Sequence, residues 1–176
     1  MATYKIDPDH SDIMFKVKHL MISTATGTFK KFDGTLEANE KDLSDAKVNF
    51  EADINSIDTK NEQRDAHLKS DDFFNAEQYP KMTFKSTSIQ KLSDEEYKLV
   101  GDLTIRDVTK PVELKVEYNG EITDPWGNER LGFEITGKIN RRDYGLKWSA
   151  VTEAGGIVVA DEVKLQLNVE MIKLAA

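Results

Sequence analysis

The sequence contains no cysteine and only three histidines, His10, His19 and His67. Without cysteine the chain can form no disulfide, no zinc–thiolate site and no thiol nucleophile. The histidines form neither an HxH nor an HExxH pattern, and no nucleophile elbow, phosphate-binding loop or dinucleotide fingerprint occurs. We therefore expect no metal, no cofactor and no catalytic residues in this protein.

The chain also lacks a long apolar run and an excess of basic charge. No segment of about 18 apolar residues occurs, so we expect no integral membrane segment. The first residues turn polar at once and do not resemble an export signal, which predicts a cytoplasmic location, or a periplasmic one if a leader has been removed. With 24 Lys and Arg against 32 Asp and Glu, the net charge is −8, which argues against nucleic acid as a partner.

What the sequence does contain is a repeated alternation of apolar and polar residues. This period of two is typical of a β-strand with one dry face and one wet face. Turn residues are expected at Asp33-Gly34, Asn119-Gly120, residues 125–128 and Gly155-Gly156. About eight segments show the alternation, some weakly: 13–19, 28–38, 48–54, 82–89, 97–105, 112–118, 131–139 and 163–171.

Strands with one apolar face must bury that face against one another. Because nearly every segment is apolar on one side and charged on the other, the pattern favours closure around a single interior. We therefore predict an all-β protein, an eight-stranded antiparallel barrel, with residues 1–176 forming one domain. A barrel of this size can either fill itself with side chains or hold one small ligand, and the pattern leaves both alternatives open.

One segment interrupts the alternation, between Ser56 and Tyr79. Thr59 to Glu62 matches a capping box with Thr59 as the N-cap, which predicts a helix over about residues 60–69. The run 70–72 can cap a second short turn that carries Phe73 and Phe74. We expect this helical insertion, about residues 59–75, to cover one end of the barrel.

Several basic residues are candidates for a polar contact with a ligand. His19 is in phase with the inward positions of its strand, and is expected to be either a core or rim histidine or a headgroup contact. Arg64 and His67 lie on adjacent helical faces, where they either anchor the helix or bind an anion. Arg141 and Arg142 are expected to pair with carboxylates, although either could also bind a phosphate in a bidentate manner.

A series of short motifs along the chain, taken in order, is distinctive although no single one is. These motifs include Ile6-Asp7-Pro8-Asp9-His10-Ser11, Gly27-Thr28-Phe29, Arg64-Asp65-Ala66-His67-Leu68, Asp72-Phe73-Phe74, Val108-Thr109-Lys110-Pro111-Val112 and Asp143-Tyr144-Gly145-Leu146. From about Tyr4 to Met171 the chain resembles the YceI-like family, the lipocalin-like polyisoprenoid-binding proteins of bacteria. The resemblance implies a lipocalin-like barrel with a helix between strands, and family members often form homodimers.

The resemblance also implies a long apolar pocket for an isoprenoid or another long-chain lipid. The residues expected to line this pocket are Phe15, Val17, Phe50, Phe73, Phe74, Phe84, Leu103, Leu114, Phe133 and Ile135. The ligand headgroup is expected near His19, Arg64 and His67.

The expected function is therefore non-enzymatic binding, transport or storage of a polyisoprenoid, an isoprenoid quinone or a fatty-acid-like lipid. One alternative is an enzyme that acts on such a lipid, with a histidine as base and an arginine as anion stabiliser. Another alternative is a filled barrel that serves only as an interaction module.

Overall fold

A computed structural model describes residues 1–39, 42–148 and 158–175 of the chain. These described residues form eleven β-strands, one α-helix, α1 (Glu62–Lys69), and three 3-10 segments, η1 (Pro8–His10), η2 (Ile54–Ser56) and η3 (Arg141–Tyr144). The strands are β1 (Ala2–Ile6), β2 (Asp12–His19), β3 (Ser23–Phe29), β4 (Phe32–Ala38), β5 (Lys47–Asp53), β6 (Ile57–Asp58), β7 (Lys81–Lys91), β8 (Glu96–Ile105), β9 (Val108–Thr123), β10 (Glu129–Asn140) and β11 (Val159–Lys173).

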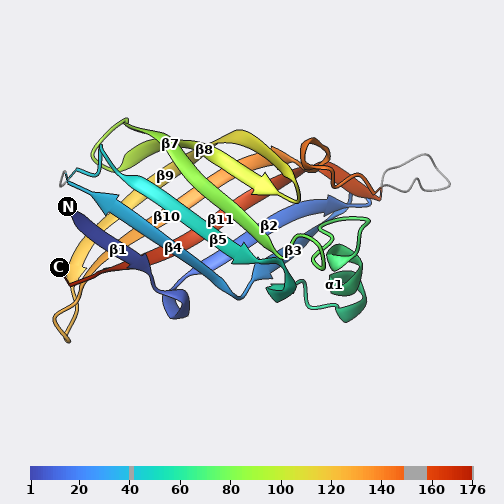
Figure 1. The fold of residues 1–176 in the computed structure, drawn as a ribbon, viewed down its shortest axis with the longest axis horizontal. Helices are drawn as coiled ribbons and strands as arrows, with labels where there is room; N and C mark the ends of the chain where they lie inside the picture. The colour runs from blue at the N-terminus through green and yellow to red at the C-terminus, as the bar shows by residue number, and fades with distance from the viewer. Residues whose placement is uncertain (40–41, 149–157, 176) are drawn as a thin grey trace.

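The sheet closes into an eight-stranded antiparallel barrel, which confirms the predicted fold (Figure 1). The ring runs β1-β4-β5-β7-β8-β9-β10-β11, and β11 pairs with β1 to complete it. Each remaining strand adjoins a ring strand across a short interruption: β2 follows β1 after η1, β3 precedes β4, and β6 follows β5 after η2. Beyond these interruptions β2 pairs with β11, β3 with β2, and β6 with β3.

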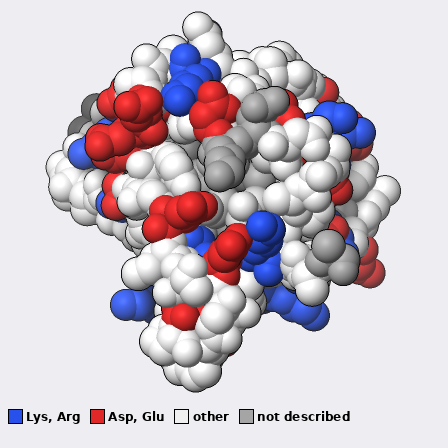
Figure 2. Space-filling model, turned by 90° about the vertical axis from the view of Figure 1, so that its left-hand side faces the viewer, with Lys and Arg blue, Asp and Glu red and all other residues white. Residues whose placement is uncertain are grey.

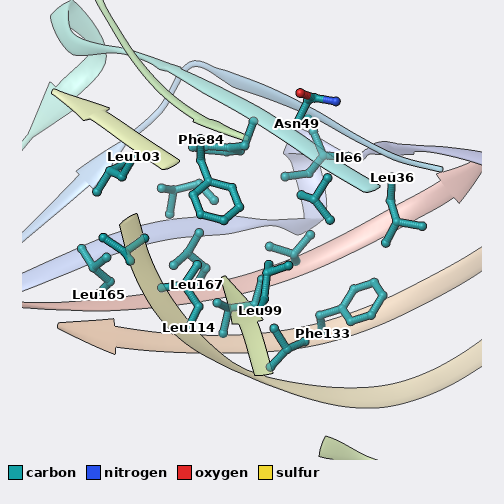
Figure 3. A pocket seen from close by; sticks show the side chains of 18 of the residues that line it. Ile6, Leu36, Asn49, Phe84, Leu99, Leu103, Leu114, Phe133, Leu165 and Leu167 are labelled. Carbon is teal, nitrogen blue, oxygen red and sulfur yellow. The ribbon is translucent and has the colours of Figure 1, made fainter. Parts of the chain in front are cut away.

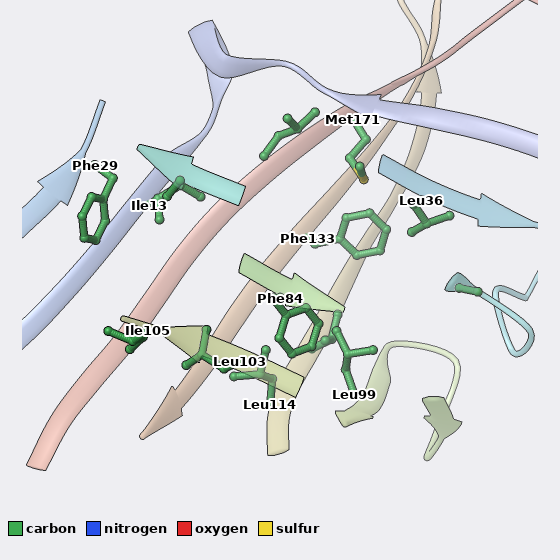
Figure 4. Close-up of a cluster of buried hydrophobic side chains, with 14 of the residues drawn as sticks. Ile13, Phe29, Leu36, Phe84, Leu99, Leu103, Ile105, Leu114, Phe133 and Met171 are labelled. Atoms are coloured by element: carbon green, nitrogen blue, oxygen red, sulfur yellow. The ribbon is translucent and has the colours of Figure 1, made fainter. Parts of the chain in front are cut away.

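The alternation in the sequence sets which side chains enter the barrel. Along β8, Tyr97, Leu99, Leu103 and Ile105 are all buried, whereas Asp102 between them is exposed. Side chains of this kind from β7, β8, β9 and β10 converge on the barrel axis (Figure 4). The core of the protein is therefore the inner wall of the barrel, and the site described below lies within it.

Two of the predicted turns are wrong, because Asp33-Gly34 and Asn119-Gly120 both lie inside strands. Gly34 belongs to β4, and the strand is interrupted instead at residues 30–31, between β3 and β4. Gly120 lies in β9, opposite Gly132, whereas Tyr118 is opposite Phe133, so Asn119 is an extra residue that forms a β-bulge. The turn predicted at residues 125–128 is confirmed as the β9–β10 connection, and Gly155-Gly156 lies outside the described residues.

The predicted helix is present, but its N-cap is Asn61 rather than Thr59. The Asn61 side-chain oxygen accepts a hydrogen bond from the Arg64 backbone N–H at 2.9 Å, and α1 starts at Glu62. Thr59 is not available as a cap because its hydroxyl and backbone N–H both donate to the Asp65 carboxylate. No helix among the described residues is long and apolar enough to cross a lipid bilayer.

The two ends of the barrel are built from different elements (Figure 1). The closed end carries both chain termini and the β4–β5 connection, from which Leu43 and Ala46 are buried against the interior. Tyr97 donates its hydroxyl to the carbonyl of Asp42, which ties this connection to β8. Acidic and basic side chains are interspersed over the surface of the closed end (Figure 2). The helical end, on the opposite side, carries α1, the β2–β3 hairpin and η3.

Candidate functional site

The interior of the barrel contains an apolar cavity of about 150 Å³, the inner chamber. Phe84, Leu99 and Leu114 converge on it from three neighbouring strands, while the polar Asn49 directs its amide away (Figure 3). Its lining includes seven of the predicted pocket residues: Phe15, Phe50, Phe84, Leu103, Leu114, Phe133 and Ile135. Further lining residues that the prediction did not name follow the same alternation, namely Ile6, Ile13, Leu36, Val48, Val116, Leu167, Val169 and Met171.

A second cavity of about 230 Å³, the outer chamber, lies at the helical end. The remaining predicted residues all line it: Val17, Phe73 and Phe74, with His19, Arg64 and His67 as the predicted polar contacts. The two chambers share Phe15, Phe29, Met82, Ile139 and Leu165 as wall residues, so they are neighbours along one axis. We call the two adjoining chambers, together with the waist between them, the tunnel.

Aromatic rings form the waist between the chambers. The Phe15 and Phe29 ring centroids lie 5.7 Å apart, and the Phe74 ring meets Phe29 edge-on at 6.1 Å. The Phe15 ring occupies space that a Cβ at Gly27 would need, since such an atom would lie 2.2 Å from the ring. The position of Phe15, and with it the width of the waist, therefore depends on Gly27 having no side chain.

The outer chamber is covered by a cluster of rings from α1 and the segments that follow α1 and η3. His67 meets Trp148 edge-on at 4.8 Å and Phe73 at 5.1 Å, measured between ring centroids. Its Nε2 atom lies 2.8 Å from the Asp72 carboxylate, which holds the ring in place. The sequence prediction did not place Trp148 here, because nothing local to a loop tryptophan indicates its distant contacts.

Arg64 fastens α1 to the barrel and keeps one nitrogen free. Its Nε donates to the Thr59 hydroxyl at 2.8 Å, and one terminal nitrogen donates to the Thr59 carbonyl at 2.6 Å. The other terminal nitrogen, Nη1, has no hydrogen-bond partner among residues 1–39, 42–148 and 158–175. Arg64 thus anchors the helix, and the free nitrogen leaves it able to bind a ligand as well.

His19 is the final residue of β2 and lies at the rim of the outer chamber. Its backbone is held between Ser23 of β3 and Val159 of β11. Within the part of the chain that the structure describes, its half-buried ring makes no hydrogen bond and no ion pair. The imidazole is therefore available to a ligand.

Arg141 is almost completely buried in the wall of the outer chamber, with only 2% of its surface exposed. It was expected to pair with a carboxylate, but its main partners are backbone carbonyls. Its guanidinium donates to the carbonyls of Leu146, Trp148, Val159 and Ala160 at 2.6, 2.8, 3.2 and 2.9 Å. Arg142, in contrast, donates to Asp161 at 2.6 Å as predicted.

These contacts make Arg141 a structural cation and leave it no room to bind a phosphate. The nearest carboxylate, on Asp161, is 3.7 Å from its guanidinium, and burial lowers the pKa of Arg141. Through these hydrogen bonds Arg141 links η3 to β11 and to residues 146–148. The sequence could not indicate this, because the four acceptors are backbone atoms that only the fold brings together.

The ionisable residues that line the described part of the outer chamber are all basic. They are His19, Arg64, His67 and Arg141, together with Lys18, which is exposed at the rim in an outward position of β2. Carboxylates such as Asp72 and Asp161 lie behind these groups and do not line the cavity. In a chain with a net charge of −8, the chamber therefore presents locally positive groups toward its contents.

Comparison with known proteins matches residues 4–171 to the model of the YceI-like domain. The chain is 43% identical over 174 residues to Protein YceI of Escherichia coli O157:H7, covering 98% of this chain and 87% of that protein. It is 34% identical to a Campylobacter jejuni YceI crystal structure, with a TM-score of 0.76 and 90% of each chain covered.

Two more distant structures share the fold. BcnA of Burkholderia cenocepacia superposes with a TM-score of 0.82 at 22% identity, covering 94% of this chain and 98% of BcnA. A polyisoprenoid-binding domain of Saccharophagus degradans superposes with a TM-score of 0.71 at 15% identity, covering 97% and 98% of the two chains. The match over nearly the whole sequence, together with the shared barrel, shows that this chain belongs to the YceI-like family.

Proposed function

We propose that this protein binds a long-chain apolar molecule, a polyisoprenoid, an isoprenoid quinone or a fatty-acid-like lipid, without altering it chemically. The tail lies in the inner chamber and the headgroup in the outer chamber. The observation that carries this proposal is the tunnel, whose described lining is apolar along the inner chamber and includes basic residues at the helical end. The S. degradans domain with the same fold is a polyisoprenoid-binding domain, which is consistent with this proposal.

The energy available from such burial is sufficient for useful binding. Removing about ten methylene groups from water gives ~8 kcal/mol at ~0.8 kcal/mol each. That value corresponds to a roughly micromolar dissociation constant before the cost of ordering the chain is subtracted. Together the chambers offer a few hundred cubic ångströms, near the lower end of ordinary ligand pockets. A longer chain requires the waist at Phe15 to widen.

The two alternative functions have less support. A filled barrel predicts an interior without room for a ligand, whereas the described residues enclose two cavities. An enzyme requires a base close to a nucleophile or an acidic substrate proton. His67 has a carboxylate partner in Asp72, but among the described residues no hydroxyl group hydrogen-bonds to its ring.

The binding proposal is tested by native mass spectrometry of the purified protein, followed by solvent extraction of whatever it carries. We expect an added mass that disappears on extraction and matches an unmodified long-chain lipid. If nothing co-purifies, the stripped protein is titrated with isoprenols, quinones and fatty acids. Failure of every member of this panel to bind contradicts the proposal, and recovery of a chemically changed lipid favours the enzyme.

The two tryptophans provide an internal reporter for this titration. Trp126 is 81% exposed at the closed end, whereas Trp148 packs against His67 in the outer chamber. In a Trp126→Phe variant the only remaining indole lies beside the proposed headgroup site. We expect its fluorescence to change in proportion to bound lipid.

We further propose that the headgroup lies closest to His19, Arg64 and His67. His19 and the free Nη1 of Arg64 have unused hydrogen-bonding capacity, and the chamber lining favours an anionic or electron-rich head. Arg64→Ala should reduce the preference for an isoprenyl phosphate over the isoprenyl alcohol of the same length. If the variant melts like the parent and keeps that preference, Arg64 only anchors the helix.

A further inference from the structure

The β2–β3 hairpin exposes three consecutive apolar side chains at its tip. Leu20, Met21 and Ile22 have 39%, 61% and 84% of their surface exposed. Leu20 and Met21 have positive φ angles of 53° and 60°, which residues of this type rarely adopt. Asn or Gly would suit this backbone better. Because the three side chains are exposed, neither the backbone conformation nor packing in the core explains the apolar residues at the tip.

This apolar tip is joined directly to the rim of the outer chamber. It follows His19, and the Leu20 backbone N–H donates to the carbonyl of Val158 at 2.8 Å. His19 and Val158 both line the outer chamber. The Ile22 N–H and the Ser23 hydroxyl also bond to the His19 carbonyl, at 3.2 and 3.3 Å. The tip therefore projects from the rim of the outer chamber and is held there by hydrogen bonds.

Basic residues continue from the tip along the outside of the barrel. Lys16 and Lys18 occupy the outward positions of β2, and Lys16 is opposite Lys164 of β11, which is opposite Lys138 of β10. Lys16, Lys18 and Lys164 form no ion pair with any described residue, and Lys138 has only Glu162 at 3.8 Å. Like charges opposite each other on adjacent strands are unfavourable. An anionic surface would relieve this repulsion.

We propose that the apolar tip inserts into the headgroup region of an anionic lipid bilayer, with the lysines of β2 and β11 on the membrane surface. Exposed apolar side chains next to basic ones are the combination that peripheral proteins use to bind such membranes. This inference rests on the proposed function, because docking places the rim of the outer chamber against the bilayer, where a long-chain lipid can enter without crossing water.

The closed end provides a natural comparison. Trp126 is also exposed at a hairpin tip, but the basic residues near it, Arg130 and Lys173, are already paired with Asp124 and Glu129, and this tip therefore offers an anionic membrane no free cation among the described residues. The bilayer should therefore contact the helical end of the barrel, even though the closed end carries the larger apolar side chain.

Docking is tested by sedimentation of the whole protein with vesicles of phosphatidylcholine and phosphatidylglycerol in equal parts, at low salt. The double variant Met21→Asn/Ile22→Ser removes the apolar side chains and places at position 21 a residue that tolerates positive φ. We expect binding to fall by about tenfold to a hundredfold, because two apolar side chains that insert into the bilayer in the parent are lost. Trp126→Ser is the matched control and should bind like the parent.

Charge is tested separately with Lys16→Gln/Lys18→Gln and with vesicles of phosphatidylcholine alone. Either change should weaken binding and remove most of its dependence on salt. Light scattering follows the oligomeric state in parallel. If the Met21→Asn/Ile22→Ser protein dissociates from dimer to monomer but binds vesicles as the parent does, the tip is a contact between two copies and the proposal is wrong.

Three results overturn the docking proposal: no vesicle binding by the parent, unchanged binding by the Met21→Asn/Ile22→Ser variant, or loss of binding by Trp126→Ser instead. Solvent extraction separates docking from the proposed function. A tip variant that still holds its lipid but no longer sediments with the vesicles supports docking. A parent that binds vesicles but never holds a lipid contradicts the lipid-binding function and leaves the docking result standing.

Discussion

The closed end and the helical end of the barrel differ in the side chains that cover the interior. At the closed end Leu43 and Ala46 are buried like ordinary core residues, and the Tyr97 hydroxyl bonds to a backbone carbonyl. At the helical end the chamber is covered by rings and basic groups, and His19 has no partner among the described residues. The difference is therefore one of lining: the closed end is packed with apolar side chains, whereas the helical end brings aromatic and basic side chains to the cavity.

The largest effect is expected from a charge in the half of the tunnel near the closed end. Phe133 is buried in the inner chamber and stacks on Tyr118 at 5.3 Å. Phe133→Glu places an unpaired carboxylate there and should reduce the free energy of unfolding by about 4–5 kcal/mol, measured by urea denaturation.

Its neighbour serves as the control for the register of β10. Glu134 is exposed on the outer wall, so Glu134→Lys should change stability by less than about 0.5 kcal/mol. Similar losses at the two positions would show that the inner and outer faces of this strand are assigned incorrectly.

The next largest effect is expected at the helical end, from the buried cation. Arg141→Met leaves four backbone carbonyls without their donor and should cost about 3 kcal/mol of stability in the same assay. Arg142→Met removes only a half-exposed ion pair with Asp161 and should cost less than about 1 kcal/mol. Equal costs would mean that Arg141 is not the element that holds η3 to β11.

A smaller effect on stability, but a clear one on binding, is expected at the waist. In Gly27→Ala the new Cβ would lie 2.2 Å from the Phe15 ring, so the ring must shift. We expect this shift to reduce the free energy of unfolding by about 1–2 kcal/mol. A narrower waist should weaken binding of long isoprenols more than that of short ones, measured by titration across a length series. If affinity for all lengths falls equally, the two chambers do not form one path.

The last effect, which depends on pH, is expected under acid conditions from ion pairs near the closed end. Arg130 donates to Asp124 at 2.7 Å and to Asp7 at 2.8 Å, which raises the pKa of Arg130 and lowers that of Asp124 from 3.8 to about 2. Because the folded-state pKa is depressed, the stabilisation is complete above pH 3.8 and is lost as the pH falls through about 2.

The pH dependence is checked by comparing urea midpoints of the parent and Arg130→Gln over a series from neutral pH down to 2. The parent should be more stable by a constant amount above pH 4 and should lose that advantage below it. A difference that does not change with pH would mean that Arg130 acts by packing rather than through the Asp124 charge.

Much of the tunnel could be predicted because strand geometry converts a period of two into an inside and an outside. All ten predicted pocket residues line one of the two chambers, while their contact with a lipid stays a prediction. Where the prediction was wrong, a local signal had a different tertiary use. The Asn119-Gly120 pair, typical of a hairpin turn, instead forms a bulge in β9, and Thr59 bonds to Asp65 rather than capping α1.

The sequence by itself determined the closed all-β architecture, the helical insertion and the apolar interior, since each follows from spacing along the chain. Only the tertiary structure decided that Arg141 bonds to carbonyls from two segments and that Trp148 packs on His67. It also decided that Phe15 and Phe29 divide the interior into two chambers. These features depend on distances between residues far apart in sequence. Side-chain periodicity does not encode such distances, because they are set only when the strands pair and the barrel closes.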